Sequence, residues 1–218
     1  MRKVDIIILS VCALLVVVSV AALLLWFNQA ESSRAVQDDP INFSRDPIQD
    51  SSVREALPVL HFGKRMVVMN AKAKYTIDGQ LVSKKRYTHS YMNELAPYDF
   101  ALTWGDMPKY LNQIKFSQSS RFCLYKMKKN ATVDPKYMQN HMSNNHLIPA
   151  SNNIKKAMRK ARKGDLIRIE GHLVHVETSK AGRMISSWNS SVTREDTGDG
   201  ACEIIYVTRL RIGDMVYE

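Results

Sequence analysis

Asp165-Leu-Ile-Arg-Ile-Glu-Gly-His-Leu-Val-His-Val-Glu177 alternates apolar and polar residues, as a β-strand with one buried face does. Ile167 and Ile169 share one face, whereas the two valines near the end of the stretch fall on the opposite parity. A β-bulge at Gly171-His172 would bring all four to one side and would bend the strand. The stretch therefore predicts a bulged central strand in a small barrel or a strongly curved sheet.

The residues before this strand predict a hairpin and a few shorter strands. Lys72–Ile77 and Gln80–Ser83 flank Asp78-Gly79, and the Asp-Gly pair suits the type I′ turn of a two-residue hairpin loop. Further strands are expected at 121–126, 184–193 and 201–212.

One helix is expected directly before the central strand. Ser151 or Asn152 can cap its start, apolar residues recur at helical spacing from Ile154 to Ala161, and Gly164 can end it. The helical region carries six cations and no acidic residue before Asp165. These cations are Lys155, Lys156, Arg159, Lys160, Arg162 and Lys163.

Two interpretations of this basic helix remain open. As a binding surface it would attract lipid headgroups, anionic envelope polymers or an acidic partner protein. As a solvated face it would serve solubility, and the cations near its end would also favour the helix dipole. Nucleic acid is not an expected partner, because aromatic residues that stack on bases are absent from this stretch.

Several strands with a single helix predict an α+β domain that is mostly β, with an OB-like barrel or curved sheet. Residues 61–218 have the usual length of one domain. The segment 28–60 is rich in Ser, Asp, Gln and Pro and is expected to be a polar spacer.

The N-terminal segment predicts a membrane anchor. Residues 6–27 form an apolar run without a charge, and at about 1.5 Å per residue a helix of this length spans a bilayer core. Arg2 and Lys3 favour a cytoplasmic tail at residues 1–5 and an external C-terminal domain. A cleaved signal peptide is the alternative, although Asn28-Gln29-Ala30 is a poor cleavage site.

The chain has three cysteines, and Cys12 falls inside the apolar run. Cys123 and Cys202 can pair if the domain lies in an oxidising compartment. The alternative is that both are buried thiols.

Four motifs carry a resemblance to other proteins. They are Trp104-Gly105-x-Met107, His141-x4-His146-x-Ile-Pro-Ala150, Gly164-Asp165-x-Ile-x-Ile-Glu-Gly171 and the stretch from Ser191 to Glu203. Together they resemble a group of uncharacterised bacterial proteins with an N-terminal membrane anchor. The resemblance covers roughly residues 75–206. It implies a single-pass protein of the bacterial inner membrane with an external domain, and it implies no activity.

Metal ligands are sparse in the sequence. His141 and His146 lie about 140° apart on a helix, so only a loop would let both reach one ion. Asp196 and Asp199 lie among glycines but lack the ligand spacing of a calcium loop, and a glycine turn explains the pattern. We therefore predict no metal and no cofactor, with these four residues as weak metal candidates.

A cysteine nucleophile is the sharpest catalytic hypothesis. The order of His146, the Lys-Gly-Asp-Leu-Ile-Arg-Ile segment, Cys202 and Arg209 resembles that of sortases, the cysteine transpeptidases of the cell surface. The resemblance implies a histidine acid and an arginine that stabilises the oxyanion. The Thr-Leu-x-Thr-Cys sequence of sortases is missing. Odd spacing on one strand would also send Cys202 and Arg209 to opposite faces.

Two functions from different classes follow. The favoured one is a membrane-anchored envelope protein whose external domain is a binding or accessory module for an anionic ligand or a partner protein. The alternative is a sortase-like cysteine transpeptidase or hydrolase that uses Cys202 and His146.

Overall fold

The computed structural model describes residues 3–29, 31, 33–34, 39–53, 55–193 and 202–218, with the backbone alone for 3–11 and 33–34. The chain divides into two compact units, Met1–Glu31 and Ser32–Glu218. The first unit contains one helix, α1 (Lys3–Phe27). Within the described residues, no helix combines the length and the hydropathy that a membrane crossing requires.

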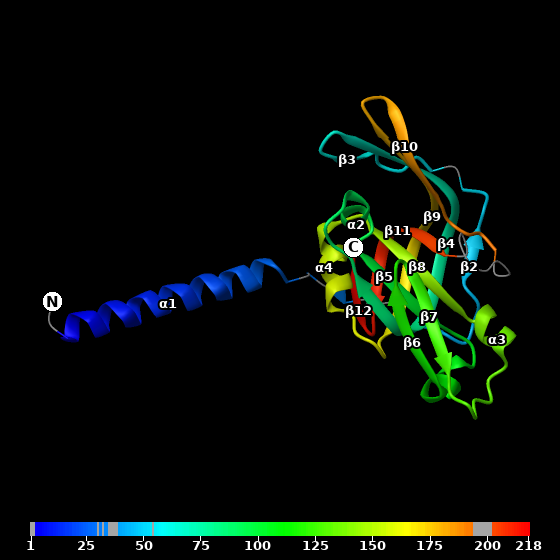
Figure 1. Cartoon of the computed structure of the whole chain (residues 1–218), viewed down its shortest axis with the longest axis horizontal. Coiled ribbons are helices and arrows are strands. Elements are labelled where there is room, and N and C mark those ends of the chain that lie inside the picture. The colour runs from blue at the N-terminus through cyan, green and yellow to red at the C-terminus, as the bar shows by residue number, and fades with distance from the viewer. Residues whose placement is uncertain (1–2, 30, 32, 35–38, 54, 194–201) are drawn as a thin grey trace. The chain divides into compact units, whose positions relative to one another are not determined.

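The second unit is built on a ring of paired strands (Figure 1). In chain order the strands of the ring are β4 (Arg65–Arg86), β5 (Tyr98–Thr103), β8 (Met142–Pro149), β9 (Leu166–Lys180) and β11 (Glu203–Ile212). β4 pairs with β5, β5 with β8, β8 with β11, β11 with β9, and β9 again with β4. Only the β8–β11 pair is parallel among these five. The sheet therefore closes on itself.

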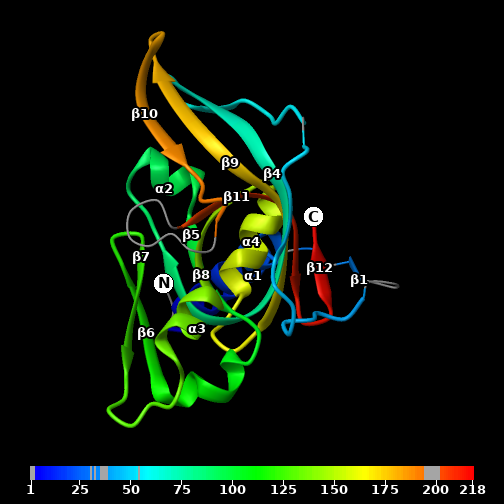
Figure 2. The same ribbon diagram turned by 90° about the vertical axis from the view of Figure 1, so that its right-hand side faces the viewer.

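Shorter elements surround this ring, and Figure 2 shows them from the side. The prediction of an α+β domain that is mostly β is confirmed. The remaining elements are β1 (Ser33–Arg34), β2 (Ile48–Asp50), β3 (Leu60–Phe62), α2 (Tyr91–Leu95), the 3-10 helix η1 (Met107–Gln113), β6 (Ile114–Ser119), β7 (Phe122–Met127), α3 (Pro135–Asn140), α4 (Asn152–Lys160), β10 (Arg183–Asn189) and β12 (Met215–Tyr217).

The predicted hairpin at Asp78-Gly79 is wrong, because β4 runs straight through both residues. The Asp78 side chain is buried and accepts hydrogen bonds from Arg168 Nε at 2.6 Å and Nη2 at 2.8 Å. A Cβ on Gly79 would lie 3.0 Å from the carbonyl oxygen of Thr103 on the neighbouring strand. This glycine allows close packing between strands rather than a turn.

The predicted bulge at Gly171-His172 is also displaced. The register shifts next to it leave Thr208 of β11 and Lys72 of β4 as the extra residues, so the irregularities lie in the partners of β9. Gly171 has a different role. A Cβ there would overlap the carbonyl oxygen of Tyr206 and lie 2.9 Å from its carbonyl carbon. Only glycine lets β11 approach β9 this closely.

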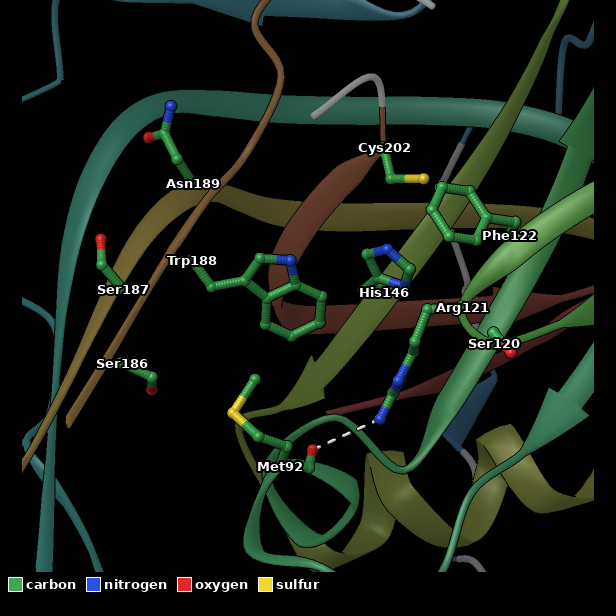
Figure 3. Close-up of a pocket in the computed structure, with 10 residues that line it drawn as sticks. All are labelled: Met92, Ser120, Arg121, Phe122, His146, Ser186, Ser187, Trp188, Asn189 and Cys202. Atoms are coloured by element: carbon green, nitrogen blue, oxygen red, sulfur yellow. Dashed lines mark hydrogen bonds between the residues drawn. The ribbon is translucent and has the colours of Figure 1, made fainter. Parts of the chain in front are cut away.

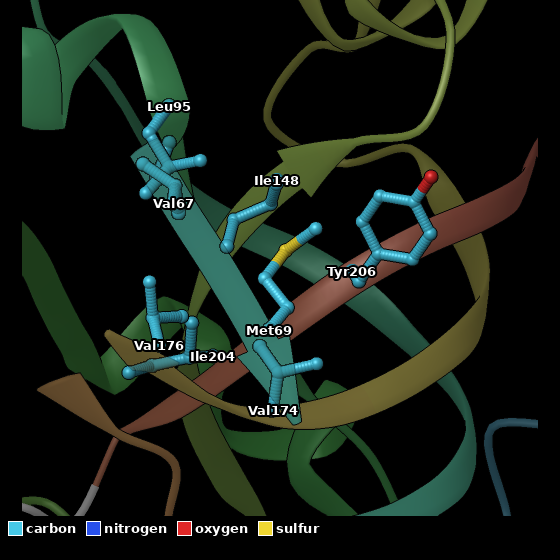
Figure 4. Close-up of a cluster of buried hydrophobic side chains, with 9 residues drawn as sticks. Val67, Met69, Leu95, Ile148, Val174, Val176, Ile204 and Tyr206 are labelled. Carbon is cyan, nitrogen blue, oxygen red and sulfur yellow. The ribbon is translucent and has the colours of Figure 1, made fainter. Parts of the chain in front are cut away.

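A buried apolar cluster fills the space between β4, β8, β9, β11 and α2 (Figure 4). Val174 and Val176 belong to it, together with Val67 and Met69 of β4. Each such side chain contributes about 1.5–3 kcal/mol when it leaves water. The cluster consists of Val67, Met69, Leu95, Ala96, Ile148, Val174, Val176, Ile204 and Tyr206.

Helix α4 forms where the sequence predicts it. The Ser151 side chain accepts a hydrogen bond from the backbone N–H of Ile154, and Gly164 follows the helix with φ +99°. Lys84 of β4 donates to the backbone carbonyl oxygens of Met158 and Arg159 at the C-terminal end. A cation placed there satisfies carbonyls that no helical N–H reaches.

The polar segment predicted as a spacer at 28–60 is part of the second unit from Ser32 onward. Arg168 donates to the carbonyl oxygens of Asp39 and Pro40, and the backbone N–H of Asn42 donates to Asp78. Buried charges on the barrel hold this segment, which its composition alone did not indicate.

Replacing Gly171 by alanine is expected to destabilise the barrel by about 3 kcal/mol or more, because the new methyl group overlaps the backbone of β11. Gly213→Ala is the matched control, since Gly213 has open space around it and only a positive φ, worth about 1–2 kcal/mol. Urea unfolding measures both. Equal losses would contradict the close-approach argument.

The Asp78 carboxylate is expected to make stability depend on acid. Burial alone would raise the pKa of Asp78, but hydrogen bonds from Arg168 and Asn42 outweigh it and hold the pKa below its ordinary value. The stabilisation is therefore complete above the unfolded value of about 3.9 and is lost as the pH falls through the lower folded pKa.

Asp78→Asn should cost about 3 kcal/mol at pH 7 and flatten the loss of stability below pH 4, as urea unfolding at several pH values would show. Asp106→Asn is the control, because Asp106 and its partner Lys109 are exposed and such pairs contribute at most about 1 kcal/mol. An unchanged acid profile in Asp78→Asn would contradict this assignment.

Candidate functional site

A pocket of about 690 Å³ opens at one side of the barrel (Figure 3). Its walls come from α2, the β6–β7 turn, β8, β10 and the residue before β11. Most of the surface that these residues expose to the pocket is apolar, and polar groups are interspersed in it, as in small-molecule and substrate sites. The lining residues are Met92, Ser120, Arg121, Phe122, His146, Ser186, Ser187, Trp188, Asn189 and Cys202.

His146 lies on β8 directly opposite Asp99 of β5 in the strand register. Its Nδ1 is 2.8 Å from Asp99 Oδ1, and Asp99 is completely buried. This contact is a close approach that lacks the alignment of a hydrogen bond. A carboxylate beside Nδ1 favours the tautomer that carries its proton there. The lone pair of Nε2, on the other side of the ring, is then available as a base.

Arg121 supplies the second contact of the buried carboxylate. Its Nη1 donates to Asp99 Oδ1 at 2.7 Å, and its Nη2 donates to Asn93 Oδ1 at 2.8 Å. The guanidinium also lies 3.9 Å from the centroid of the Tyr87 ring. These contacts neutralise Asp99 and hold Arg121 in the wall of the pocket.

The turn that carries Arg121 is strained. Ser120 and Arg121 have backbone φ values of +50° and +71°, which residues other than glycine rarely adopt. The hydroxyl oxygen of Tyr87 accepts a hydrogen bond from the Arg121 N–H, and Asn144 donates to the Arg121 carbonyl. Burial and the nearby charge of Asp99 raise the pKa of Tyr87 to about 12, so this hydroxyl stays protonated. Strain held by so many contacts is typical of functional sites.

Cys202 is the residue directly before β11, and its side chain lines the same pocket as the His146 ring (Figure 3). Asn144 Nδ2 donates to Cys202 Sγ at 3.6 Å. Cys123 is the other cysteine of the domain, and burial and then the charge of Cys202 raise its pKa. The two cysteines are thiols in the structure rather than the disulfide that the sequence allows.

The structure thus brings together two of the three residues in the catalytic hypothesis. Arg209, which the sequence places in the oxyanion role, is not among the lining residues. Its guanidinium contacts Glu170 at 2.7 Å and Glu218 at 3.0 Å instead. The parity objection to Cys202 does not apply, because Cys202 precedes β11.

The other predicted site residues lie elsewhere. His141 stacks on Tyr137 with a centroid distance of 3.8 Å, and its Nδ1 contacts the Tyr137 carbonyl. Asp196 and Asp199 fall outside the described residues. In the part of the chain that the structure describes, no group of three metal-ligating side chains is found. The helical region's Lys155, Arg159, Lys160, Arg162 and Lys163 are exposed, whereas Lys156 is half-buried.

Sequence reasoning missed Asp99, Arg121 and Trp188. Asp99 did leave a signal, because it is the one charge in the strand Tyr-Asp-Phe-Ala-Leu-Thr, which is buried along its whole length. A carboxylate in such a strand needs a partner. Arg121 and Trp188 left no comparable signal.

Comparison with known proteins adds no assignment: no family model, no curated protein and no solved structure matches the chain.

Cys202 in the pocket and Cys123 on β7 are expected to differ in reactivity. Burial, and then the charge of Cys202, raise the pKa of Cys123 to about 12. Only about one Cys123 thiol in ten thousand is then ionised at pH 8. Iodoacetamide should therefore modify Cys202 at least about tenfold faster than Cys123, as peptide mass spectrometry would show, and denaturation should abolish the difference. Faster labelling of Cys123 would contradict this assignment.

Proposed function

We propose that the pocket is the active site of a cysteine-dependent acyl transferase or hydrolase. The observation that carries the proposal is the shared position of Cys202 and His146 in one pocket, with buried Asp99 behind the imidazole. A nucleophile, a base and a group that orients the base are the parts that acyl transfer requires.

The proposed chemistry proceeds in two steps. His146 Nε2 takes the thiol proton, and the Cys202 sulfur attacks an acyl carbon, which forms a thioester. The leaving amine or alcohol departs with the proton from His146. Water or an amine then gives its proton to His146 and attacks the thioester, the carbon–sulfur bond breaks, and His146 passes the proton to the sulfur, which regenerates the thiol.

The site differs from the sortase pattern in its arginine. The arginine that lines the pocket is Arg121 rather than Arg209, and its N–H groups donate to Asp99, Asn93 and the Met92 carbonyl. We assign Arg121 to positioning.

An OB-like fold supports a ligand site at this position. The order of the strands around the ring is β4, β5, β8, β11 and β9, which is the order 1-2-3-5-4 when the five strands are counted along the chain. Helix α4 lies between the third and the fourth of these strands in the chain. OB-folds bind ligands on the face of strands 2–3 and with the loops 1–2 and 4–5. Met92, His146 and Trp188 come from the corresponding first connection, third strand and last connection.

We further propose that the domain is an external module of a bacterial inner-membrane protein. The support is the uncharged run at 6–27 and the two cations before it. A binding or accessory module is the second candidate function. The exposed cations of α4 favour it, because an anionic lipid, an envelope polymer or an acidic envelope protein would bind such a surface.

The enzyme proposal is tested with p-nitrophenyl acetate, a general acylating substrate. The full-length protein should release nitrophenol in a burst and gain one acetyl group, which peptide mass spectrometry places on Cys202. His146→Gln should slow acylation at least about a hundredfold, since general base catalysis contributes 10²–10⁴-fold. Cys202→Ala should abolish the burst.

Cys123→Ser is the matched control and should keep the burst, because Cys123 is largely protonated. Acylation that does not depend on His146 would reject the enzyme and leave the binding module as the function.

A further inference from the structure

Two hairpin turns lie side by side at the end of an arm that extends from the barrel (Figure 1). The β3–β4 turn and the β9–β10 turn are joined through the pairing of Arg65 with Lys180 and of Lys180 with Arg183. We call residues 62–66 and 180–185 the arm tip. The arm tip is distinct from both the pocket and α4.

The arm tip has one sign of charge. It contains four cations, Lys64, Arg65, Lys180 and Arg183, and no acidic residue. Three of them are exposed, and Arg65 is half-buried over the Tyr91 ring at 4.7 Å. The nearest acid along β9 is Glu177, whose carboxylate contacts His175 at 3.3 Å.

The arm tip also exposes large apolar side chains. Met184 is 65% exposed, Ile185 48% and Met66 42%. A register shift between Met184 and Ser186 interrupts the alternation of β10 beside Ile185. Two consecutive apolar residues are therefore exposed on the edge strand β10.

We propose that the arm tip docks on the surface of an anionic bilayer, with Met184, Ile185 and Met66 in the headgroup–acyl boundary and the cations on the lipid phosphates. Exposed apolar groups surrounded by cations are the features of peripheral membrane contacts. Charge complementarity favours lipid over a neutral protein surface. Ser186 and Trp188, close along β10, line the pocket, so a docked tip would bring the pocket near the lipid.

The test uses the full chain in nanodiscs of phosphatidylcholine alone or with one third phosphatidylglycerol. Hydrogen exchange is measured for the peptides that cover 62–66 and 180–185. Exchange in both should slow at least about fivefold in the anionic discs, since each basic residue near such a surface adds about a factor of five in affinity.

Two double variants separate charge from insertion. Lys180→Gln/Arg183→Gln and Met184→Ser/Ile185→Ser should each abolish the protection. The controls, Lys155→Gln/Lys160→Gln on α4 and Met215→Ser on β12, should keep it. Both control sites are exposed but lie outside the arm tip.

Three outcomes would overturn the proposal. Equal exchange in both discs would exclude an anionic lipid partner. Protection that survives Met184→Ser/Ile185→Ser would indicate attraction to charge without insertion. Protection that depends on protein concentration rather than on lipid would identify a second protein copy as the occupant.

Discussion

The completely buried carboxylate of Asp99 is the constraint on which the pocket depends. An isolated buried carboxylate costs several kcal/mol, so it must be paired within the fold. Arg121 and His146 both contact its Oδ1, at 2.7 and 2.8 Å. One carboxylate oxygen on β5 therefore contacts both the arginine of the β6–β7 turn and the imidazole on β8, and these two neighbouring side chains line the pocket.

The closed ring makes this arrangement possible. The β5–β8 register sets His146 opposite Asp99. The parallel pairing of β8 with β11 sets Ile204 beside His146, so Cys202 lies two residues before the partner of His146. The β6–β7 hairpin returns Arg121 to the same place, at the cost of two left-handed residues in its turn. Residues 99 and 146 lie on the paired strands β5 and β8, whereas residues 121 and 202 lie in connections that return to the same side of these strands.

The sequence predicts what local chemistry determines. The mostly β class, α4 and its Ser151 cap follow from periodicity and hydrogen-bonding side chains close in sequence. Cys202 and His146 line one pocket, and the sequence groups them only through a residue order that resembles sortases. The turn prediction at Asp78-Gly79 is wrong because this dipeptide is compatible with two structures. It can form a turn, or, as here, its aspartate can form a buried ion pair while its glycine allows a close contact between strands. Only the partner Arg168, 90 residues away, distinguishes them.

The same limit explains the arginine. Sequence order favours Arg209, but Arg209 forms ion pairs with two glutamates and is not among the lining residues. Arg121 reaches Asp99 from a strained turn, and no local sequence pattern predicts that turn. The central claim is that buried Asp99 orients His146 for Cys202. It is tested most directly by the pH profile of Cys202 alkylation in the native protein and in Asp99→Asn. The account predicts that native Cys202 reacts well below the ordinary thiol pKa of about 8.5, and that Asp99→Asn moves the profile up toward it. Superimposable profiles would contradict it.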